Sequence, residues 1–273
     1  VKNGGKRVRP LLTLLFYNAC GKDDVLKAMP MAEAVEFIHT YSLIHDDLPC
    51  MDNDDFRRGK PSNHKVYGEA IALLAGDGLL TAAFERISVW SLAGLYDTET
   101  AIKAIHELSV YAGARGMIGG QIIDIGNENN PDADFDNLKL MDSLKTGCLI
   151  SVACALGCIA AGASQDLIDS AKTFGEKLGL AFQIKDDILD VTSTLEKLGK
   201  MTGSDKENNK YDEYGNLIRT GWEVYKDNFK QYQCDACRCN VEKNVKLNAK
   251  TNYQILQTLT TEMSDDDILN LAS

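Results

Sequence analysis

One amide and three carboxylates form the most regular candidate site in the sequence. Gln183, Asp186, Asp187 and Asp190 are spaced i, i+3, i+4 and i+7, so on a helix they share one face. Carboxylates on one face repel one another unless a cation neutralises them. Oxygen ligands of this kind suit Mg²⁺, which often shares its coordination with substrate phosphates. The spacing therefore predicts a magnesium site, with a solvated acidic helix face as the alternative.

A second acidic cluster ends an earlier apolar run and contains Asp46, Asp47 and Asp52. Asp46 and Asp52 would not share a face of an unbroken helix. Because Pro49 prevents a regular helix from continuing, we expect the chain to loop and return Asp52 towards Asp46. A basic run begins at Arg57, so metal ligands and direct phosphate donors follow one another closely. An ordinary charged surface loop is the alternative.

A short basic segment near the start of the sequence is a third candidate. Lys6 and Arg9 lie three residues apart at an expected helix start, where free backbone N–H groups favour anions. Taken alone, such a segment is more often solvated.

We expect helices to position these residues. Apolar side chains recur at three- and four-residue spacing, and convincing period-2 strands are absent. We therefore expect an all-α fold. The expected helices cover residues 8–20, 30–48, 66–93, 98–114, 116–125, 135–163, 165–193 and, with a weaker pattern, 220–233.

Composition narrows the function. A formal charge of −11 over 273 residues argues against general nucleic-acid binding, although carboxylates that bind metal could still recruit an anion. Residues 146–165 carry no charge, so a membrane span must be considered. Their many small residues favour a closely packed buried helix instead, with no stable membrane insertion. Scattered cysteines fit a reducing, cytoplasmic setting.

The character of the sequence changes near residue 210, where we place a domain boundary. Residues 211–273 form a divergent tail of unknown fold, and a foreign segment joined by frameshift, recombination or assembly error is one interpretation. Cys234, Cys237 and Cys239 offer three thiolates to zinc, which would need an outside ligand or Asp235. Free thiols in a loop are the alternative.

Several segments, taken in order, resemble the trans-isoprenyl diphosphate synthases and in particular the bacterial farnesyl diphosphate synthases. The resemblance covers residues 1 to about 210 and is highly specific. The segments that carry it are Gly4 to Pro10, His39 to Pro61, Leu74 to Leu80, Gly119 to Asp124, Leu144 to Gly147 and Phe182 to Asp190.

The resemblance implies an all-α isoprenoid-synthase bundle whose two aspartate motifs face a central cavity. Both motifs would hold Mg²⁺, usually three ions, against an allylic diphosphate, with Mn²⁺ as an alternative metal. The implied metal ligands are Asp46, Asp47, Asp52, Asp186, Asp187 and Asp190. The implied catalytic and allylic-site residues are Arg57, Lys145, Thr146, Gln183 and Lys200. The implied site for isopentenyl diphosphate contains Lys6, Arg9, His39 and Arg58, and Lys210 could match a further substrate-binding lysine.

The reaction implied is prenyl transfer. Metals and cations stabilise the departing diphosphate, an allylic carbocation forms, and the double bond of isopentenyl diphosphate attacks it. Loss of a proton, with the departed diphosphate as the implied base, completes the step. Tyr41 and Ser42 match the positions that set product length in this family, and an aromatic residue at position 41 favours farnesyl diphosphate. An ordinary core aromatic is the alternative.

Other functions stay open. A geranylgeranyl diphosphate synthase belongs to the same class, whereas the unfamiliar tail suggests an inactive remnant or a regulatory subunit. A terpene cyclase would not need the isopentenyl site. The sequence begins at Val1, three residues before the Gly4 motif and without an initiator methionine, so we expect an N-terminally truncated synthase. A homodimer is expected by resemblance.

Overall fold

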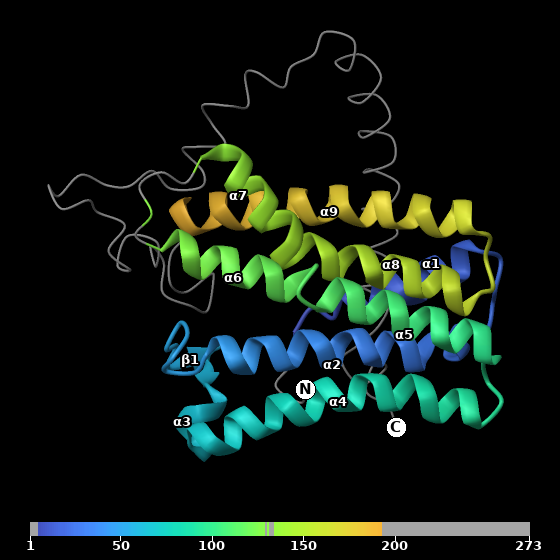
Figure 1. Ribbon diagram of the computed structural model, residues 1–273, viewed down its shortest axis with the longest axis horizontal. Helices are drawn as coiled ribbons and strands as arrows, with labels where there is room; N and C mark the ends of the chain where they lie inside the picture. Colours follow the sequence, from blue (N-terminus) through green and yellow to red (C-terminus); the bar gives the residue numbers. More distant parts are fainter. Residues whose placement is uncertain (1–4, 129, 131–133, 193–273) are drawn as a thin grey trace, which may run out of the picture. The chain divides into compact units, whose positions relative to one another are not determined.

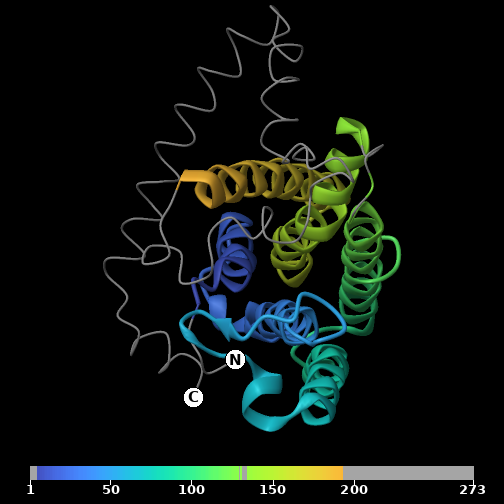
Figure 2. The same cartoon turned by 90° about the vertical axis from the view of Figure 1, so that its left-hand side faces the viewer.

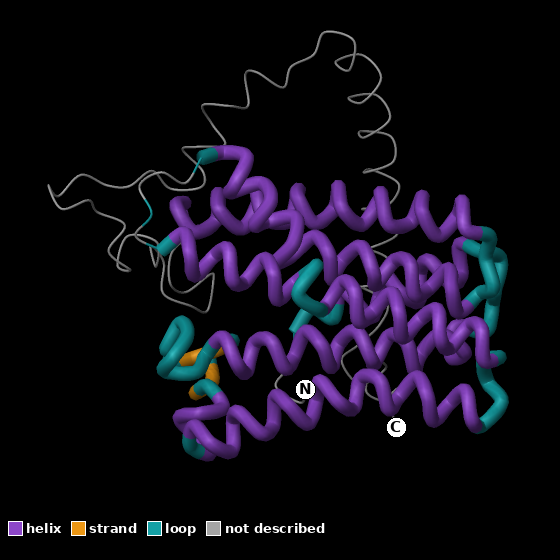
Figure 3. Tube along the Cα trace, viewed as in Figure 1, coloured by secondary structure: helices purple, strands orange, loops and turns teal. Residues whose placement is uncertain are grey.

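The computed structural model describes residues 5–128, 130 and 134–192, with the backbone alone at residues 135 and 184–192. Within this part of the chain almost every element is helical, as Figure 3 shows. The helices are α1 (Val8–Ala19), the 3-10 turn η1 (Val25–Ala28), α2 (Met29–Asp46), α3 (Asn63–Tyr67), α4 (Glu69–Leu92), α5 (Thr98–Ala112), α6 (Met117–Asn127), α7 (Phe135–Asp142), the π-helix η2 (Ser143–Gly147), α8 (Cys148–Ala160) and α9 (Gln165–Thr192). The expected all-α fold is confirmed.

Helix α8 is the centre of the bundle. Every residue from Leu149 to Ile159 is buried. Figure 2 shows α8 between α1 on one side and α5 on the other, with α2 below it and α9 above. Small side chains along α8 let these neighbours approach closely, while Leu149, Ile150 and Leu156 fill the space between them. The apolar character of this segment therefore has a packing explanation.

The same segment bears on the question of a membrane span. Among the described residues, the helical run Asp136–Ala160 is long and apolar enough to cross a membrane, but 72% of its apolar window is buried within the protein. Burial of this extent favours the interpretation as a packed core helix.

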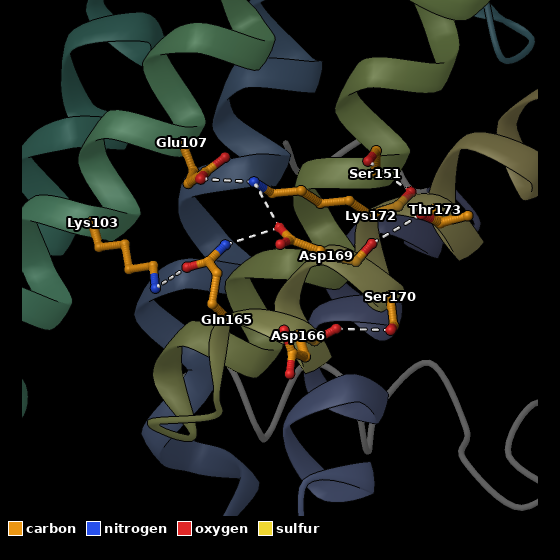
Figure 4. Close-up of polar contacts among 9 residues, drawn as sticks. All are labelled: Lys103, Glu107, Ser151, Gln165, Asp166, Asp169, Ser170, Lys172 and Thr173. Atoms are coloured by element: carbon orange, nitrogen blue, oxygen red, sulfur yellow. Dashed lines mark hydrogen bonds and ion pairs between the residues drawn. The ribbon is translucent and has the colours of Figure 1, made fainter.

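Polar contacts fasten the first half of α9 to α5 and α8 (Figure 4). Lys172 Nζ lies 2.8 Å from Glu107 Oε1, and the Ser151 hydroxyl donates to the Lys172 carbonyl at 2.9 Å. Lys103 Nζ donates to Gln165 Oε1 at 2.7 Å. The second half of α9 carries the regular stripe of aspartates, so these contacts anchor the helix that presents it.

The structure differs from the sequence-based expectations in three places. The helix expected over residues 66–93 is divided into α3 and α4 at Gly68, whose φ of 86° ends the first helix. The helix expected over 135–163 contains the π-turn η2. A small hairpin, β1 (Phe56–Arg57) paired antiparallel with β2 (Lys60–Pro61), was not expected because two-residue strands show no periodicity. The expected helix 220–233, the boundary at residue 210 and the tail lie outside the described residues.

Candidate active site

Among the described residues, both aspartate motifs singled out in the sequence lie at one end of the helical bundle. In Figure 1 the carboxyl ends of α2, α6 and α9 lie at the same end, together with the hairpin. The first aspartate motif begins at Asp46, the last residue of α2, and continues into the loop that follows. The backbone of the second motif forms the last turns of α9, so both motifs are presented at this end.

The loop after α2 folds back on itself as expected. The Asp52 amide donates to the Asp46 carbonyl at 2.9 Å, and the Asn53 amide donates to the Leu48 carbonyl at 3.1 Å. Asn53 has a φ of 52°, which lets the chain turn sharply. The predicted return of Asp52 towards Asp46 is therefore confirmed.

The three aspartates of this loop have different surroundings. Asp47 is 3% exposed and accepts from Arg57 Nε at 2.6 Å, so its charge is balanced by an arginine within the protein. Arg57 also donates to Asp54 at 3.1 Å. Asp46 and Asp52 instead experience the charge of Lys145. Burial raises the pKa of Asp46 to about 6 against the opposing effect of Lys145, and Asp52 adds to the rise.

Lys145 connects this loop to α6. Its Nζ pairs with the Asp124 carboxylate. Burial alone would lower the pKa of Lys145, but Asp124 and the two loop aspartates raise it. We name the group of Asp46, Asp47, Asp52, Arg57 and Lys145 the acidic pole.

The backbone around Lys145 packs closely against two glycines. A Cβ at Gly120 of α6 would lie 2.2 Å from the Lys145 amide nitrogen, and a Cβ at Gly179 of α9 would lie 2.6 Å from the Gly147 Cα. Neither position has room for a side chain. The π-helix η2 is thus clamped between α6 and α9, and π-turns of this kind are frequent at functional sites.

The acidic pole offers carboxylates for a divalent cation. Its donors are carboxylate oxygens, the ligands that Mg²⁺ prefers, and burial raises the pKa values of Asp46 and Asp52. Among the described side chains, however, no group of three or more His, Cys, Asp or Glu residues is arranged to hold a metal. Because Mg²⁺ commonly takes one or two carboxylates and completes its shell with water and phosphate oxygens, the residues present fit such an ion.

A second group of charges lies beside the first and is dominated by cations. His39 of α2 faces Arg9 and Arg58, and burial together with these arginines lowers its pKa to about 2. Arg9 has a buried Nε with no hydrogen-bond partner in the described part of the chain. Burial lowers the pKa of Arg9 to about 10, which Glu36 opposes and Arg58 reinforces.

Arg7 completes this group and was missed in the sequence. It pairs with Glu36, which is 6% exposed, and its charge also lowers the pKa values of His39 and Arg58. Its place between Lys6 and Arg9 in one basic run could have indicated it. We name the group of Arg7, Arg9, His39 and Arg58 the basic pole.

Backbone strain is concentrated at the two poles. Among the described residues, the non-glycine residues with positive φ are Arg7, Asn53 and Arg58. Arg58 (φ 55°) and Gly59 (φ 72°) form the two-residue turn of the hairpin, which needs positive φ at both positions. Left-handed conformations at non-glycine residues are unfavourable and cluster at functional sites.

The chain is similar in sequence to known proteins. A sequence model described as polyprenyl synthetase matches residues 1–212. The chain belongs to the polyprenyl synthetase family. It is 47% identical over 207 residues to a farnesyl diphosphate synthase of Bacillus subtilis, an alignment that covers 76% of the chain and 69% of the relative. It is 50% identical over 204 residues to the chloroplastic geranylgeranyl pyrophosphate synthase 3 of Arabidopsis thaliana, covering 74% of the chain and 56% of the relative.

A solved structure extends the likeness to three dimensions. A geranyltransferase of Helicobacter pylori, complexed with magnesium and isoprenyl diphosphate, matches with a TM-score of 0.72 and 33% identity, covering 92% of this chain and 85% of that one. These relatives are prenyltransferases. The chain spans little more than half of the Arabidopsis relative and 69% of the Bacillus relative.

In this polyprenyl synthetase, Tyr41 lies one turn before the acidic pole. Its side chain is 5% exposed, packs edge-on against His45 with ring centroids 5.6 Å apart, and has a hydroxyl with no partner among the described residues. Burial and the nearby charge of Asp46 raise the pKa of Tyr41. Ser42 donates to the His39 carbonyl at 3.0 Å, which places its hydroxyl against the helix backbone.

The remaining predicted site residues lie outside the two poles defined above or outside the described side chains. Gln183 donates to Asp142 at 3.3 Å, Thr146 is half-buried in η2, and Lys6 is exposed just before α1. Asp142 and Asp124, the partners of Gln183 and Lys145, were not predicted as site residues. For Asp186, Asp187 and Asp190 the structure describes the helical backbone alone, while Lys200, Lys210 and the tail cysteines lie outside the described residues.

Proposed function

We propose that this polyprenyl synthetase is a magnesium-dependent farnesyl diphosphate synthase, which condenses isopentenyl diphosphate with dimethylallyl or geranyl diphosphate. The carrying observation is the pairing of two unlike poles at one end of the bundle. The acidic pole suits a diphosphate that arrives with metal, and the basic pole suits one that binds without it. A two-substrate prenyl transfer needs both kinds of site.

At the acidic pole, the residues of the chain would orient and stabilise the leaving group. Magnesium, held by Asp46, Asp52 and the aspartates of α9, would neutralise charge on the allylic diphosphate. Lys145 is positioned by Asp124 and by the clamped backbone of η2, so its ammonium group is already in place when the carbon–oxygen bond breaks. Arg57, held by Asp47, supplies a second oriented cation.

At the basic pole, isopentenyl diphosphate would be bound by direct hydrogen bonds. The unpartnered Nε of Arg9 and the neutral imidazole of His39 are donors that an anion would satisfy. The isopentenyl double bond would attack the allylic cation, and a proton would then leave from the new chain, with the departed diphosphate as the base.

Product length rests on Tyr41. The side chain fills the core directly before the acidic pole, where the growing prenyl tail would extend. A large buried ring at this point supports a farnesyl product. The high identity to a geranylgeranyl pyrophosphate synthase favours a longer product as the second candidate.

Incubation with radiolabelled isopentenyl diphosphate, geranyl diphosphate and Mg²⁺ tests the activity, with products dephosphorylated and separated by chromatography. We expect label in farnesol and none without metal. Incorporation no greater than in the metal-free control would contradict prenyl transfer and favour an inactive remnant.

The variant Tyr41→Ala tests the product length. Removing the ring opens space along α2, so the main product should shift from farnesyl to geranylgeranyl diphosphate. Tyr41→Phe keeps the ring and should keep the farnesyl product. If Tyr41→Ala makes the same product as the parent, another residue limits the chain.

We also propose that the protein forms a homodimer. Ile118, Ile122 and Ile125 of α6 stand at i, i+4 and i+7 and are 40%, 63% and 45% exposed, which makes one apolar stripe. Sedimentation equilibrium should give twice the mass of the chain. Ile122→Glu should shift this mass towards the monomer, and a parent protein that sediments as a monomer would contradict the proposal.

A further inference from the structure

Two cysteines far apart in the sequence meet where α1 ends. Cys20 directly follows the last residue of α1, and Cys158 lies in the last turns of α8. Their Sγ atoms are 3.6 Å apart although 138 positions separate them in the chain. Neither residue belongs to the poles described above.

The packing of α1 against α8 explains this closeness. A Cβ at Gly157 would lie 2.2 Å from the Thr13 carbonyl oxygen and 2.8 Å from the Tyr17 amide nitrogen, so the two helix backbones touch there. The Thr13 hydroxyl donates to the Ala153 carbonyl at 2.9 Å and ties the same two helices one turn earlier. These contacts hold α1 and α8 close together along the turns that precede both cysteines.

The surroundings of the two thiols differ. Cys20 is partly exposed, Cys158 is 2% exposed, and the neighbouring Cys154 of α8 is fully buried. No group of three metal-ligating side chains is found among the described residues, so a metal site does not account for the cysteine pair.

We propose that Cys20 and Cys158 are a thiol pair that a hydroperoxide or a small-molecule disulfide oxidises to a disulfide joining α1 to α8. With a hydroperoxide, the Cys20 sulfur attacks the O–O bond, which gives a sulfenic acid and releases an alcohol or water. The Cys158 sulfur then attacks the Cys20 sulfur. The S–S bond forms, the S–O bond breaks, and the departing hydroxide takes the Cys158 proton as water. With a small-molecule disulfide, the Cys20 sulfur breaks the S–S bond of the reagent, which gives a mixed disulfide and releases one small thiol. The Cys158 sulfur then displaces the second small thiol, which takes the Cys158 proton.

The order of these steps follows from accessibility. Burial raises the pKa of Cys158, and the adjacent Cys20 thiol adds to the rise, so Cys158 is the less reactive thiol of the two and does not react first. Cys20 is partly exposed, so an oxidant can reach it more readily than it can reach Cys158. A disulfide needs an S–S distance of about 2.05 Å, so the sulfurs must approach by roughly 1.5 Å, which small side-chain rotations can supply.

The cross-link would restrict the unfolded chain strongly, because it closes a loop of 138 residues. For a chain of this size, the thermal midpoint should rise by about 5–15 °C on oxidation. Reduction should reverse the rise.

The experiment treats the full chain with oxidised glutathione or hydrogen peroxide, blocks free thiols with N-ethylmaleimide and maps non-reduced tryptic peptides by mass spectrometry. We expect a cross-link between the peptide ending at Lys22 and the peptide Thr146–Lys172, with fragment ions that assign it to Cys158. The variants Cys20→Ser and Cys158→Ser should each lose both the cross-link and the rise in midpoint.

Matched controls separate this pair from its neighbours. Cys154→Ser and Cys148→Ser should keep the cross-link, because their thiols lie on the same peptide but are not the partner. A cross-link from Cys20 to another cysteine would overturn the proposal. So would free thiols at both positions under conditions that fully oxidise the exposed Cys50. If Cys158→Ser fails to fold, Cys20→Ser at the more exposed position still decides the outcome.

Discussion

The acidic and basic poles lie side by side, yet they balance their charges differently. At the acidic pole, carboxylates alternate with Lys145 and Arg57, so each charge has an opposite neighbour. At the basic pole, Arg9 and Arg58 lie against His39 and against each other. Under the proposed function, a diphosphate would bind the first pole together with added metal cations, whereas it could bind the second pole directly. The two poles would therefore recognise their substrates through different electrostatic interactions.

The largest effect should come from removing a carboxylate of the acidic pole. Asp46→Asn should lower kcat by about 10³-fold, because the leaving diphosphate loses metal-mediated stabilisation. Steady-state assays measure this loss. Asp55→Asn, at an exposed carboxylate paired with Lys65 on the same loop, is the matched control and should stay within a few-fold of the parent. A similar loss in both variants would mean that the loop fold, rather than metal binding, is sensitive.

Metal removal should affect ligand binding at the two poles differently. Removal of Mg²⁺ with EDTA should weaken binding of an unreactive thio-analogue of geranyl diphosphate at least about 100-fold, as measured by calorimetric titration. Isopentenyl diphosphate should change by less than about threefold under the same conditions. Equal dependence of both ligands on Mg²⁺ would remove the distinction between the poles.

The basic pole should respond to loss of one arginine. Arg9→Gln removes a charge-assisted donor with a buried Nε, so KM for isopentenyl diphosphate should rise about 10–100-fold. KM for the allylic substrate should stay nearly constant. Arg115→Gln, at an exposed arginine, is the control and should leave both KM values unchanged. A rise in the allylic KM alone would exchange the roles assigned to the poles.

The smallest effect concerns His39 and pH. Its folded pKa of about 2 lies below the ordinary value near 6.5, so between these values the unfolded chain binds more protons and stability falls as pH falls. From pH 7.5 to 5.5 this residue should reduce the free energy of unfolding by about 1.4 kcal/mol. His39→Gln lacks this loss, which urea unfolding at both pH values would reveal. An identical pH dependence in the two proteins would mean that His39 is not shielded from protons.

The helices could be predicted because apolar residues recur at three- and four-residue spacing over long segments. The return of Asp52 to Asp46 was also predictable, since Pro49 cannot continue a helix. The hairpin was not, because strands of two residues are too short to show alternation. The π-turn η2 depends on contacts of Gly120 and Gly179 with distant backbone, which no local pattern contains.

Charge pairing was the least predictable part of the site. Spacing shows that Asp46 and Asp47 are neighbours but not that Asp47 is engaged by Arg57 while Asp46 lies near Lys145. Arg7 was overlooked because three basic residues in a short run cannot be ranked without knowing which one reaches Glu36. These distinctions arise from tertiary contacts.

The left-handed backbone conformation of Arg58 affects how the protein could be made more resistant to heat. Glycine or asparagine would fit the φ of 55° better, and the arginine there is held at a cost of roughly 1–2 kcal/mol. Selection for heat resistance alone would therefore tend to discard this arginine, and with it part of the basic pole. The hairpin turn is a position where durability and catalysis make opposing demands on one residue.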